Sequence, residues 1–169
     1  MIYHTQTVTV AIADTDRDRR AEYERFLQDK HGITLLRNVA SSNEVSSGRA
    51  YVDRRLKPRS DVSTSEEEVA RIKRLKPLVL LLNLNLCADE DYALLLSLRY
   101  ECPEVLMILL ADDSVHDNQI IKALEIGARS YLKYETFQHH LSRAIQAVGR
   151  GEAWVPRKML GEIMDHILN

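Results

Sequence analysis

Polar residues follow two apolar segments of the chain, where their side chains could meet and do chemistry. Asp14 and Asp16 come after the segment 8–13, and Asn83 comes after the apolar run 77–82. In open α/β sheets, ligands and chemistry gather beyond the carboxyl ends of the strands. Carboxylates there could hold Mg²⁺, which takes one or two of them together with other oxygens. Asn83 carries a neutral amide, a poor nucleophile, so we expect no covalent step at this residue.

An ordinary structural role also accounts for Asn83. Buried polar groups are almost always hydrogen-bonded. We therefore interpret Asn83 itself as a buried strand terminus whose amide is bonded to neighbouring backbone. Asp14 is then the one carboxylate whose place beside Asn83 follows from the pattern, and we expect Mg²⁺ binding to be weak or absent.

Length and composition describe an ordinary globular domain. The chain has 169 residues, of which 45% are hydrophobic and 28% charged, and its net charge is −2. This charge gives no electrostatic reason to expect direct binding of nucleic acid or of an anionic membrane. Cys87 and Cys102 lack the spacing of metal ligands. The first residues do not resemble a signal peptide, and no apolar segment reaches the ~18 residues of a membrane helix. We expect a cytoplasmic protein without a cofactor.

Strand-like and helix-like segments alternate along the chain. The segments expected to form strands are 8–13, 33–39, 77–82 with Asn83 at its end, 105–110 and 130–133. The segments expected to form helices are 17–30, 63–75, 89–101, 115–126 and 136–148. Ser63 to Ser65, followed by three glutamates, are expected to cap the second helix. The alternation predicts an α/β fold with a doubly wound, five-stranded parallel sheet flanked by helices.

Residues 41–62 interrupt this alternation. They contain several serines, Gly48, Pro58 and a basic cluster from Arg54 to Arg59. We interpret them as an inserted loop, mobile or partly helical around 50–56. The basic cluster could contact nucleic acid or an acidic partner, but its acidic neighbours favour a solvated loop with local ion pairs.

The carboxyl-terminal residues 152–169 form an amphipathic pattern. Trp154 is followed by apolar residues at helical spacing, which are Met159, Leu160, Ile163, Met164 and Ile167. Such a stripe must be covered by its own domain, by a dimer mate or by a further domain. We expect it to be buried on its own domain or across a dimer.

The histidines could suggest a metal site. His139 and His140 are adjacent, and His116 and His166 lie elsewhere. Neighbouring residues of a helix point in different directions, so this pair cannot comfortably share an ion. We expect solvated histidines and no metal site.

Four motifs in order resemble one known family. Gly127-Ala128-Arg129-Ser130-Tyr131-Leu132 is similar to the entry into the fifth strand of LuxR/NarL-type response regulator receivers. Residues 144–148 followed by 151–154 are similar to their last helix and its exit, and 12–14 and the Asn83 strand complete the match. The resemblance implies the receiver (flavodoxin-like) fold over 1–151, with 152–169 as a linker helix. It also implies that an output domain usually follows, and none is seen in this sequence.

The resemblance assigns five working positions in receivers: two acids for Mg²⁺, a phosphoacceptor Asp, a Ser or Thr, and a Lys. In this chain the two acid positions fall on Asp14 and on Thr15, with Asp16 beside it, and the phosphoacceptor position falls on Asn83. The hydroxyl position falls on Leu110 or Asp112. The lysine position falls on Tyr134, with Lys133 one residue early. An offset of one residue turns a strand side chain to the opposite face. The pattern therefore resembles a degenerate receiver that lacks its phosphoacceptor.

We expect this chain to be a regulatory module that needs no phosphorylation and is not an enzyme. It would act through a protein partner or as a homodimer, through residues 115–150 and the carboxyl-terminal helix. Tyr131 matches the receiver aromatic that reports activation, although simple packing also explains it. The resemblance implies the amino-terminal regulatory part of a LuxR-type transcription regulator, or a relative of one.

Two other functions remain open from the sequence. One is a small-molecule-binding regulator that uses the emptied pocket near Asp14, Asn83 and Tyr134. The other is a receiver that is still phosphorylated on a surrogate acceptor, which would be Asp16, Asp89 or Asp112.

Overall fold

A five-stranded parallel sheet forms the centre of the molecule. The computed structural model describes residues 7–37, 61–87 and 92–168. The sheet has the order β2-β1-β3-β4-β5, and every neighbouring pair of strands is parallel. The strands are β1 (Val8–Ala13), β2 (Ile33–Leu35), β3 (Val79–Asn83), β4 (Leu106–Ala111) and β5 (Ser130–Lys133). The predicted doubly wound fold is confirmed.

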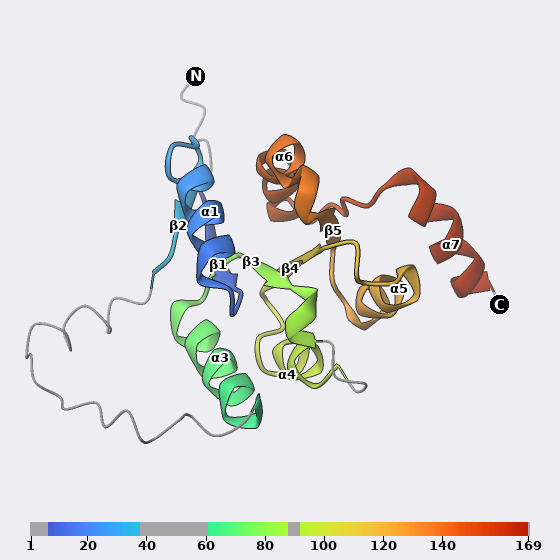
Figure 1. The fold of residues 1–169 in the computed structure, drawn as a ribbon, viewed down its shortest axis with the longest axis horizontal. Helices are drawn as coiled ribbons and strands as arrows, with labels where there is room; N and C mark the ends of the chain where they lie inside the picture. Colours follow the sequence, from blue (N-terminus) through green and yellow to red (C-terminus); the bar gives the residue numbers. More distant parts are fainter. Residues whose placement is uncertain (1–6, 38–60, 88–91, 169) are drawn as a thin grey trace, which may run out of the picture.

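Helices cover both faces of this sheet. They are α1 (Arg17–Gln28), α3 (Asp61–Leu75), α4 (Ala93–Glu101), α5 (Asp117–Ile126), α6 (Phe137–Gly149) and α7 (Arg157–Leu168), with short 3-10 helices η1 (Leu84–Cys87) and η2 (Tyr134–Thr136). In Figure 1, α1 and α6 lie on one side of the sheet, and α3, α4 and α5 lie on the other. Among the described residues, no helix is long and apolar enough to cross a lipid bilayer.

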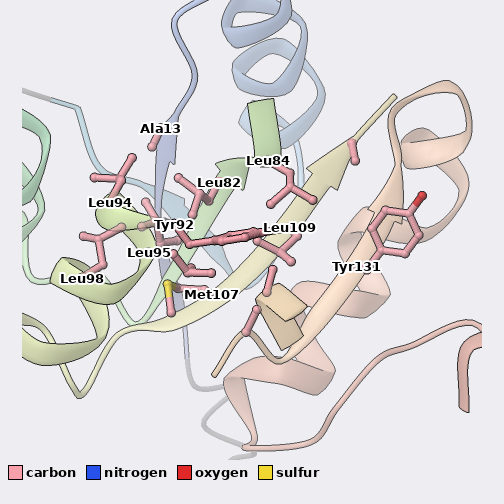
Figure 2. Packing of buried hydrophobic residues seen from close by; sticks show 14 of the residues in the cluster. Ala13, Leu82, Leu84, Tyr92, Leu94, Leu95, Leu98, Met107, Leu109 and Tyr131 are labelled. Carbon is pink, nitrogen blue, oxygen red and sulfur yellow. The ribbon is translucent and has the colours of Figure 1, made fainter. Parts of the chain in front are cut away.

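The strands are apolar at successive positions because the core has two layers. In β3, Val79 and Leu81 pack in the cluster beneath α1 and α6, whereas Leu80 and Leu82 pack in the cluster beneath α3, α4 and α5. All four side chains are fully buried. Figure 2 shows the second cluster, with contributions from β1, β3, β4, β5 and α4. A sheet covered on both faces therefore explains the continuous apolar run.

The first helix after the expected insertion begins earlier than the sequence predicted. Helix α3 begins at Asp61, so Ser63 to Ser65 lie within its first turns and the prediction that they cap it is wrong. The helix dipole favours an acidic residue such as Asp61 in the first turn of a helix. Residues 61–62 therefore belong to α3, and the rest of the expected insertion, including Arg54 to Arg59, lies outside the described residues.

Two other predicted boundaries differ by more than two residues. Strand β2 ends at Leu35 and not at residue 39, although the Leu36 N–H still donates to the Val10 carbonyl at 2.8 Å. Helix α4 begins at Ala93, because Tyr92 has a left-handed backbone with φ of 50° and cannot belong to the helix. The Tyr92 ring is buried in the core, which fixes this conformation (Figure 2).

After α6 the chain returns to the free edge of the sheet. The Trp154 N–H donates to the Arg129 carbonyl at 3.1 Å, and the Tyr131 N–H donates to the Trp154 carbonyl at 3.3 Å. Helix α7 then packs against α5, where Met159 is buried and Ile163 is half-buried in the same apolar cluster. His166 Nδ1 lies 3.5 Å from a carboxylate oxygen of Glu125 on α5.

The other side of α7 is not covered by its own domain. Leu160, Met164 and Leu168 are 49%, 54% and 75% exposed. Burial of Leu160 and Met164 by their own domain is therefore excluded, and burial of these residues across a dimer stays a prediction. A helix turns about 100° per residue, which places these two residues away from Met159 and Ile163. The side chain of Ile167 lies outside the described residues.

Candidate functional site

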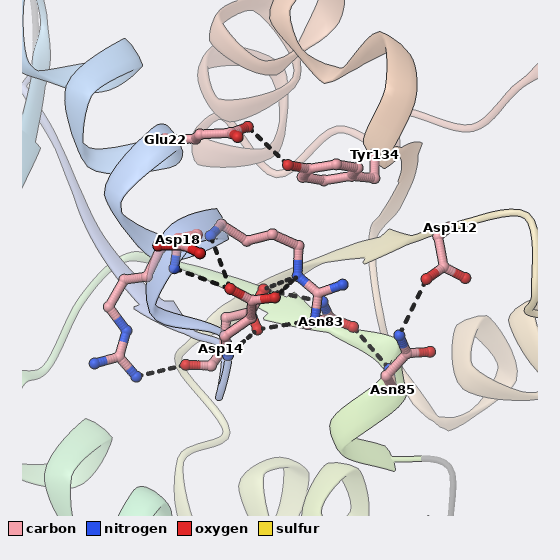
Figure 3. A network of polar contacts seen from close by, with 10 residues as sticks. Asp14, Asp18, Glu22, Asn83, Asn85, Asp112 and Tyr134 are labelled. Atoms are coloured by element: carbon pink, nitrogen blue, oxygen red, sulfur yellow. Dashed lines mark hydrogen bonds and ion pairs between the residues drawn. The ribbon is translucent and has the colours of Figure 1, made fainter.

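Asp14 and Asn83 meet at the carboxyl edge of the sheet. Asp14 directly follows β1, Asn83 ends β3, and the preceding residues Ala13 and Leu82 are partners in the parallel register. Both side chains are buried, with exposed fractions of 2% and 4% for the residues. The Asn83 Nδ2 donates to Asp14 Oδ2 at 2.9 Å (Figure 3). The structure thus brings together the two residues that the strand ends indicated.

The amide of Asn83 is used on both sides. Its Oδ1 accepts a hydrogen bond from the Asn85 N–H at 2.8 Å, while its Nδ2 is bonded to Asp14. The residue is therefore the hydrogen-bonded strand terminus that an ordinary structural role predicts.

Arg19 supplies a positive charge to this buried pair. Its Nε lies 3.2 Å from Asp14 Oδ2, and its Nη2 donates to Asp14 Oδ1 at 3.3 Å. Burial acts to lower the pKa of Arg19, but the hydrogen bond and the charge of Asp14 outweigh it and raise that pKa. A buried carboxylate is costly unless it is paired and hydrogen-bonded, so this contact offsets the cost of burying Asp14.

Backbone and side-chain donors complete the shell around Asp14. The Asp16 N–H donates to Asp14 Oδ1 at 2.9 Å, and Arg20 Nη2 donates to the Asp14 carbonyl at 2.5 Å. Asp16 itself caps α1, because its Oδ1 accepts from the N–H groups of Asp18 and Arg19 at 2.9 and 3.2 Å. Thr15 is exposed. Asp14 and Asp16 therefore both accept hydrogen bonds from groups of the protein itself.

A magnesium ion does not fit this set of donors. Both carboxylate oxygens of Asp14 already face the Arg19 guanidinium, and Asp14 Oδ2 also accepts from the Asn83 amide. Mg²⁺ requires a regular shell of oxygen ligands, whereas these partners present N–H donors. Within 7–37, 61–87 and 92–168, no cluster of three or more His, Cys, Asp or Glu side chains is placed to hold a metal. His139 and His140 are both exposed.

The position predicted for a hydroxyl is apolar. Leu110 is the register partner of Asn83, and its side chain is buried in the cluster beneath α1 and α6. Asp112 lies beyond the end of β4 and is bonded to the hydroxyl of Ser114 and, at 2.9 Å, to its N–H. These bonds from Ser114 lower the pKa of the Asp112 carboxyl. Asn85 Nδ2 also donates to Asp112 Oδ2 at 3.4 Å (Figure 3).

Tyr134 occupies the position predicted for a lysine. Its hydroxyl donates to Glu22 Oε2 at 2.7 Å, and its ring stacks on Phe137 with centroids 5.8 Å apart. The Arg19 guanidinium lies 5.9 Å from the centre of the Tyr134 ring. Burial, followed by the bond to Glu22, raises the pKa of Tyr134 to about 12. Tyr134 is therefore part of the same polar cluster as Asp14.

Lys133 and Tyr131 belong to the opposite face of β5. Leu132 packs in the cluster beneath α1 and α6, whereas Tyr131 packs in the other cluster. Alternation along the strand places the exposed Lys133 with Tyr131, away from Asp14. Tyr131 is 4% exposed, and burial, followed by the charge of Asp117, raises its pKa to about 12. Figure 2 shows it at the edge of the cluster.

An open hollow lies near the site but is not lined by it. It has a volume of about 450 Å³ and is formed by Asp113, Val115, His116, Asp117 and Asn118 of the β4–α5 connection. Asp14, Asn83 and Tyr134 do not border this hollow. Their polar atoms are bonded to one another or to close neighbours.

Solved structures identify the fold. A two-component response regulator of the LuxR family from Aurantimonas sp. SI85-9A1 matches with a TM-score of 0.69 and 15% identity, covering 97% of this chain and 100% of that one. This is the fold of a receiver domain. The isolated REC (receiver) domain of RcsB from Salmonella enterica serovar Typhimurium matches with a TM-score of 0.67 and 16% identity, over 92% and 99% of the two chains.

Longer relatives share the same receiver fold. The RcsB response regulator from Salmonella typhimurium, from a study of its conformational dynamism for DNA interaction, matches with a TM-score of 0.64 and 14% identity, over 94% of this chain and 68% of that one. No protein-family model and no curated protein sequence matches the chain. The likeness therefore establishes a receiver fold, and the chemistry has to be inferred from the residues.

Sequence reasoning missed Arg19, Glu22 and Tyr23. Arg19 reaches Asp14 from the first turn of the helix that follows β1. A basic residue five positions after a strand-end Asp was the available signal. Tyr23 packs edge-on to Phe137 with centroids 5.0 Å apart, which joins α1 to α6 beneath the site.

Proposed function

We propose that this chain is a regulatory module with a receiver fold that acts through protein–protein contacts, without aspartyl phosphorylation and without enzymatic activity. One observation carries the proposal. The strand-end carboxylate Asp14 is paired with Arg19 and bonded to Asn83, whose amide falls, by the resemblance, at the position that receivers use to accept a phosphoryl group.

The surrounding residues also disfavour phosphoryl transfer. Transfer depends on positioning and on cations that neutralise the developing charge. Leu110 beside Asn83 is apolar, and the Tyr134 hydroxyl donates to Glu22. Lys133 lies on the opposite face of β5 from Leu132 and is exposed. An incoming phosphoryl group would meet an amide, a leucine and a phenol, and the guanidinium of Arg19 is already paired with Asp14.

We place the main contact surface on the outer face of α7. The expected surface comprised α5, β5, α6 and the carboxyl-terminal helix, and of these α7 covers part of α5 through Met159 and Ile163. Leu160, Met164 and Leu168 recur every four residues and remain exposed. A row with this spacing lies along one side of a helix and suits a second helix.

The partner that fits this surface is a second copy of the chain. If two α7 helices cross in antiparallel orientation near Gly161, Lys158 of one copy would lie opposite Asp165 of the other. A Cβ added to Gly161 would meet no atom within 4 Å, so its backbone is open to close approach. A solved structure of RcsB contains two dimers of that protein bound to two DNAs. We infer that this chain is the regulatory part, or a relative, of such LuxR-type regulators and does not itself bind nucleic acid.

Sedimentation tests the contact surface. The double variant Leu160→Ser with Met164→Ser should reduce self-association and leave the fold intact. Leu96→Ser on α4 is the matched control, because Leu96 is also 49% exposed but lies on another helix. Self-association that is lost only in the control variant would move the contact to α4.

A ligand test addresses phosphorylation independence. Beryllofluoride with Mg²⁺ mimics a phosphoryl group and should leave Trp154 fluorescence and sedimentation unchanged. Trp154 is the single tryptophan and is half-buried at the edge of β5, so it reports on this region. A saturable response would contradict the proposal. A thermal-shift screen for small molecules tests the alternative of a ligand-binding regulator, since a bound ligand stabilises the native state.

A further inference from the structure

The cation of this receiver fold is an arginine of the chain itself. We infer that the Arg19 guanidinium is the permanent counter-ion of Asp14 and excludes a divalent metal from the strand-end pocket. The inference rests on the proposed phosphorylation-independent function and extends it, because it says what holds the pocket in one state.

The geometry of Arg19 matches this role. The guanidinium contacts both carboxylate oxygens of Asp14, at 3.2 and 3.3 Å, and its Nε also lies 3.8 Å from Asp16 Oδ2. The same cation therefore neutralises both acids of the pocket. The Arg19 side chain is 21% exposed and that of Asp14 is 1% exposed, so Arg19 lies between Asp14 and the solvent.

The local sequence fixes where the guanidinium can reach. Asp16 caps α1 and accepts the Arg19 N–H at 3.2 Å, which sets the backbone of Arg19 in the first turn. From there its side chain extends back over the end of β1. A metal ion at Asp14 would have to displace a group tethered within five residues, and tethering raises its effective concentration.

The guanidinium also connects Asp14 to the edge of the sheet formed by β5. It lies over the ring of Tyr134, which follows β5, and the Tyr134 hydroxyl returns to α1 by donating to Glu22. Figure 3 shows Tyr134 bonded to Glu22 in the same view as Asp14 and Asn83. The link from β1 to the β5–α6 junction is thus made by side chains of the protein.

Thermal unfolding of four proteins tests this inference: the wild type, Arg19→Met, Asp14→Asn and the double variant. Each is measured in a chelator and in millimolar Mg²⁺. Arg19→Met should lower the Tm by roughly 5–10 °C, because a buried carboxylate loses its counter-ion. Mg²⁺ should restore part of this loss in Arg19→Met alone, and should not affect the wild type. Arg17→Met is the control, since Arg17 is exposed in the same turn of α1.

In the double variant the buried charge and its partner are both removed. We therefore expect a smaller fall in Tm than the sum of the two single variants, and no response to Mg²⁺. If Arg19→Met does not fold, folding of the double variant supports the inference, because only the unpaired charge then differs. Failure of both to fold would show that Arg19 is needed for packing and would overturn it.

Two results would contradict the inference directly. One is a Tm of Arg19→Met equal to that of the wild type, or one that does not rise with Mg²⁺. The other is stabilisation of the wild type by Mg²⁺. The first result leaves the proposed function intact as long as the wild type takes up no phosphate, so the two failures can be told apart.

Discussion

Asp14 depends on partners from several parts of the chain. It receives a hydrogen bond from Asn83 on β3, an ion pair from Arg19 on α1, and a backbone bond from Asp16. Removal of any one partner leaves a buried carboxylate short of a donor, and the cost of such a group exceeds the net gain of an ordinary hydrogen bond. Substitutions at these residues should therefore act mainly on stability.

Asn83→Asp should lower the free energy of unfolding by about 2 kcal/mol, because it replaces a donor with a second buried carboxylate. It should not restore phosphorylation, since Leu110 and Tyr134 are unchanged. Denaturant unfolding measures the loss. Asn118→Asp is the control at an exposed amide near the start of α5, and should change stability by less than about 0.5 kcal/mol. Equal stability of Asn83→Asp and the wild type would contradict the account of Asp14.

The tyrosines predict a loss of stability in alkali. Folding raises the pKa of Tyr131 and of Tyr134 from 10.0 to about 12. Between these values the unfolded chain releases protons that the native state retains, so the contribution is complete below pH 10 and is lost as the pH approaches 12. Denaturant unfolding over this pH range measures the slope. Tyr134→Phe should make it shallower, and an unchanged slope would contradict the assignment.

The sequence anticipated part of this site. Asp14 and Asn83 could be placed together because each ends a buried strand of a parallel sheet. The offset of Lys133 to the other face also followed from strand alternation. Arg19 could not be found in this way, because a long side chain that folds back over a strand end leaves no periodic signal.

At the scale of elements, α7 differs on its two sides. Met159 is 5% exposed and lies in the core, whereas Met164 is 54% exposed. Met159→Ala should therefore lower the free energy of unfolding by about 2–3 kcal/mol through the cavity it leaves. Met164→Ala should change it by less than about 0.5 kcal/mol. Denaturant unfolding of the two variants is the measurement, and equal effects would show that α7 does not dock as described.

Two glycines make a second matched pair. Gly127 ends α5 with φ of 140°, and an added Cβ would lie 2.7 Å from Arg99 Nη1. Gly127→Ala should therefore destabilise the protein by about 1–2 kcal/mol, mainly through the backbone. Gly161→Ala lies in a helix with open space around it and should stabilise by up to about 1 kcal/mol. Thermal unfolding compares them, and stabilisation by Gly127→Ala would contradict the backbone assignment.

The bounds of two strands were predictable to the residue, whereas the starts of two helices were not. Strands β1 and β5 have the predicted bounds because apolar residues fill both faces and polar residues follow at once. The start of α4 was misplaced because the left-handed backbone of Tyr92 is set by burial of its ring, which is a tertiary effect. The start of α3 was misplaced because hydroxyl residues inside the first turn resemble a cap.

At the scale of the molecule, the fold persists at an identity of 15% with a solved response regulator of the LuxR family. The buried strands accompany the receiver fold, and at the strand ends Asp14 is paired with Arg19 and bonded to Asn83. Under the proposed function, regulation passes through the surfaces of the domain. Leu160, Met164 and Leu168 on the outer face of α7 are the exposed apolar row proposed for that contact.

Intact-mass spectrometry after incubation with acetyl phosphate and Mg²⁺ tests this account most directly. A receiver with an intact acceptor aspartate serves as the positive control. For the wild-type chain we predict no increase in mass, because Asn83 cannot form an acyl phosphate and Asp14 is held by Arg19. Stoichiometric incorporation of one phosphoryl group, mapped to Asp16, Asp112 or another acid, would contradict phosphorylation independence.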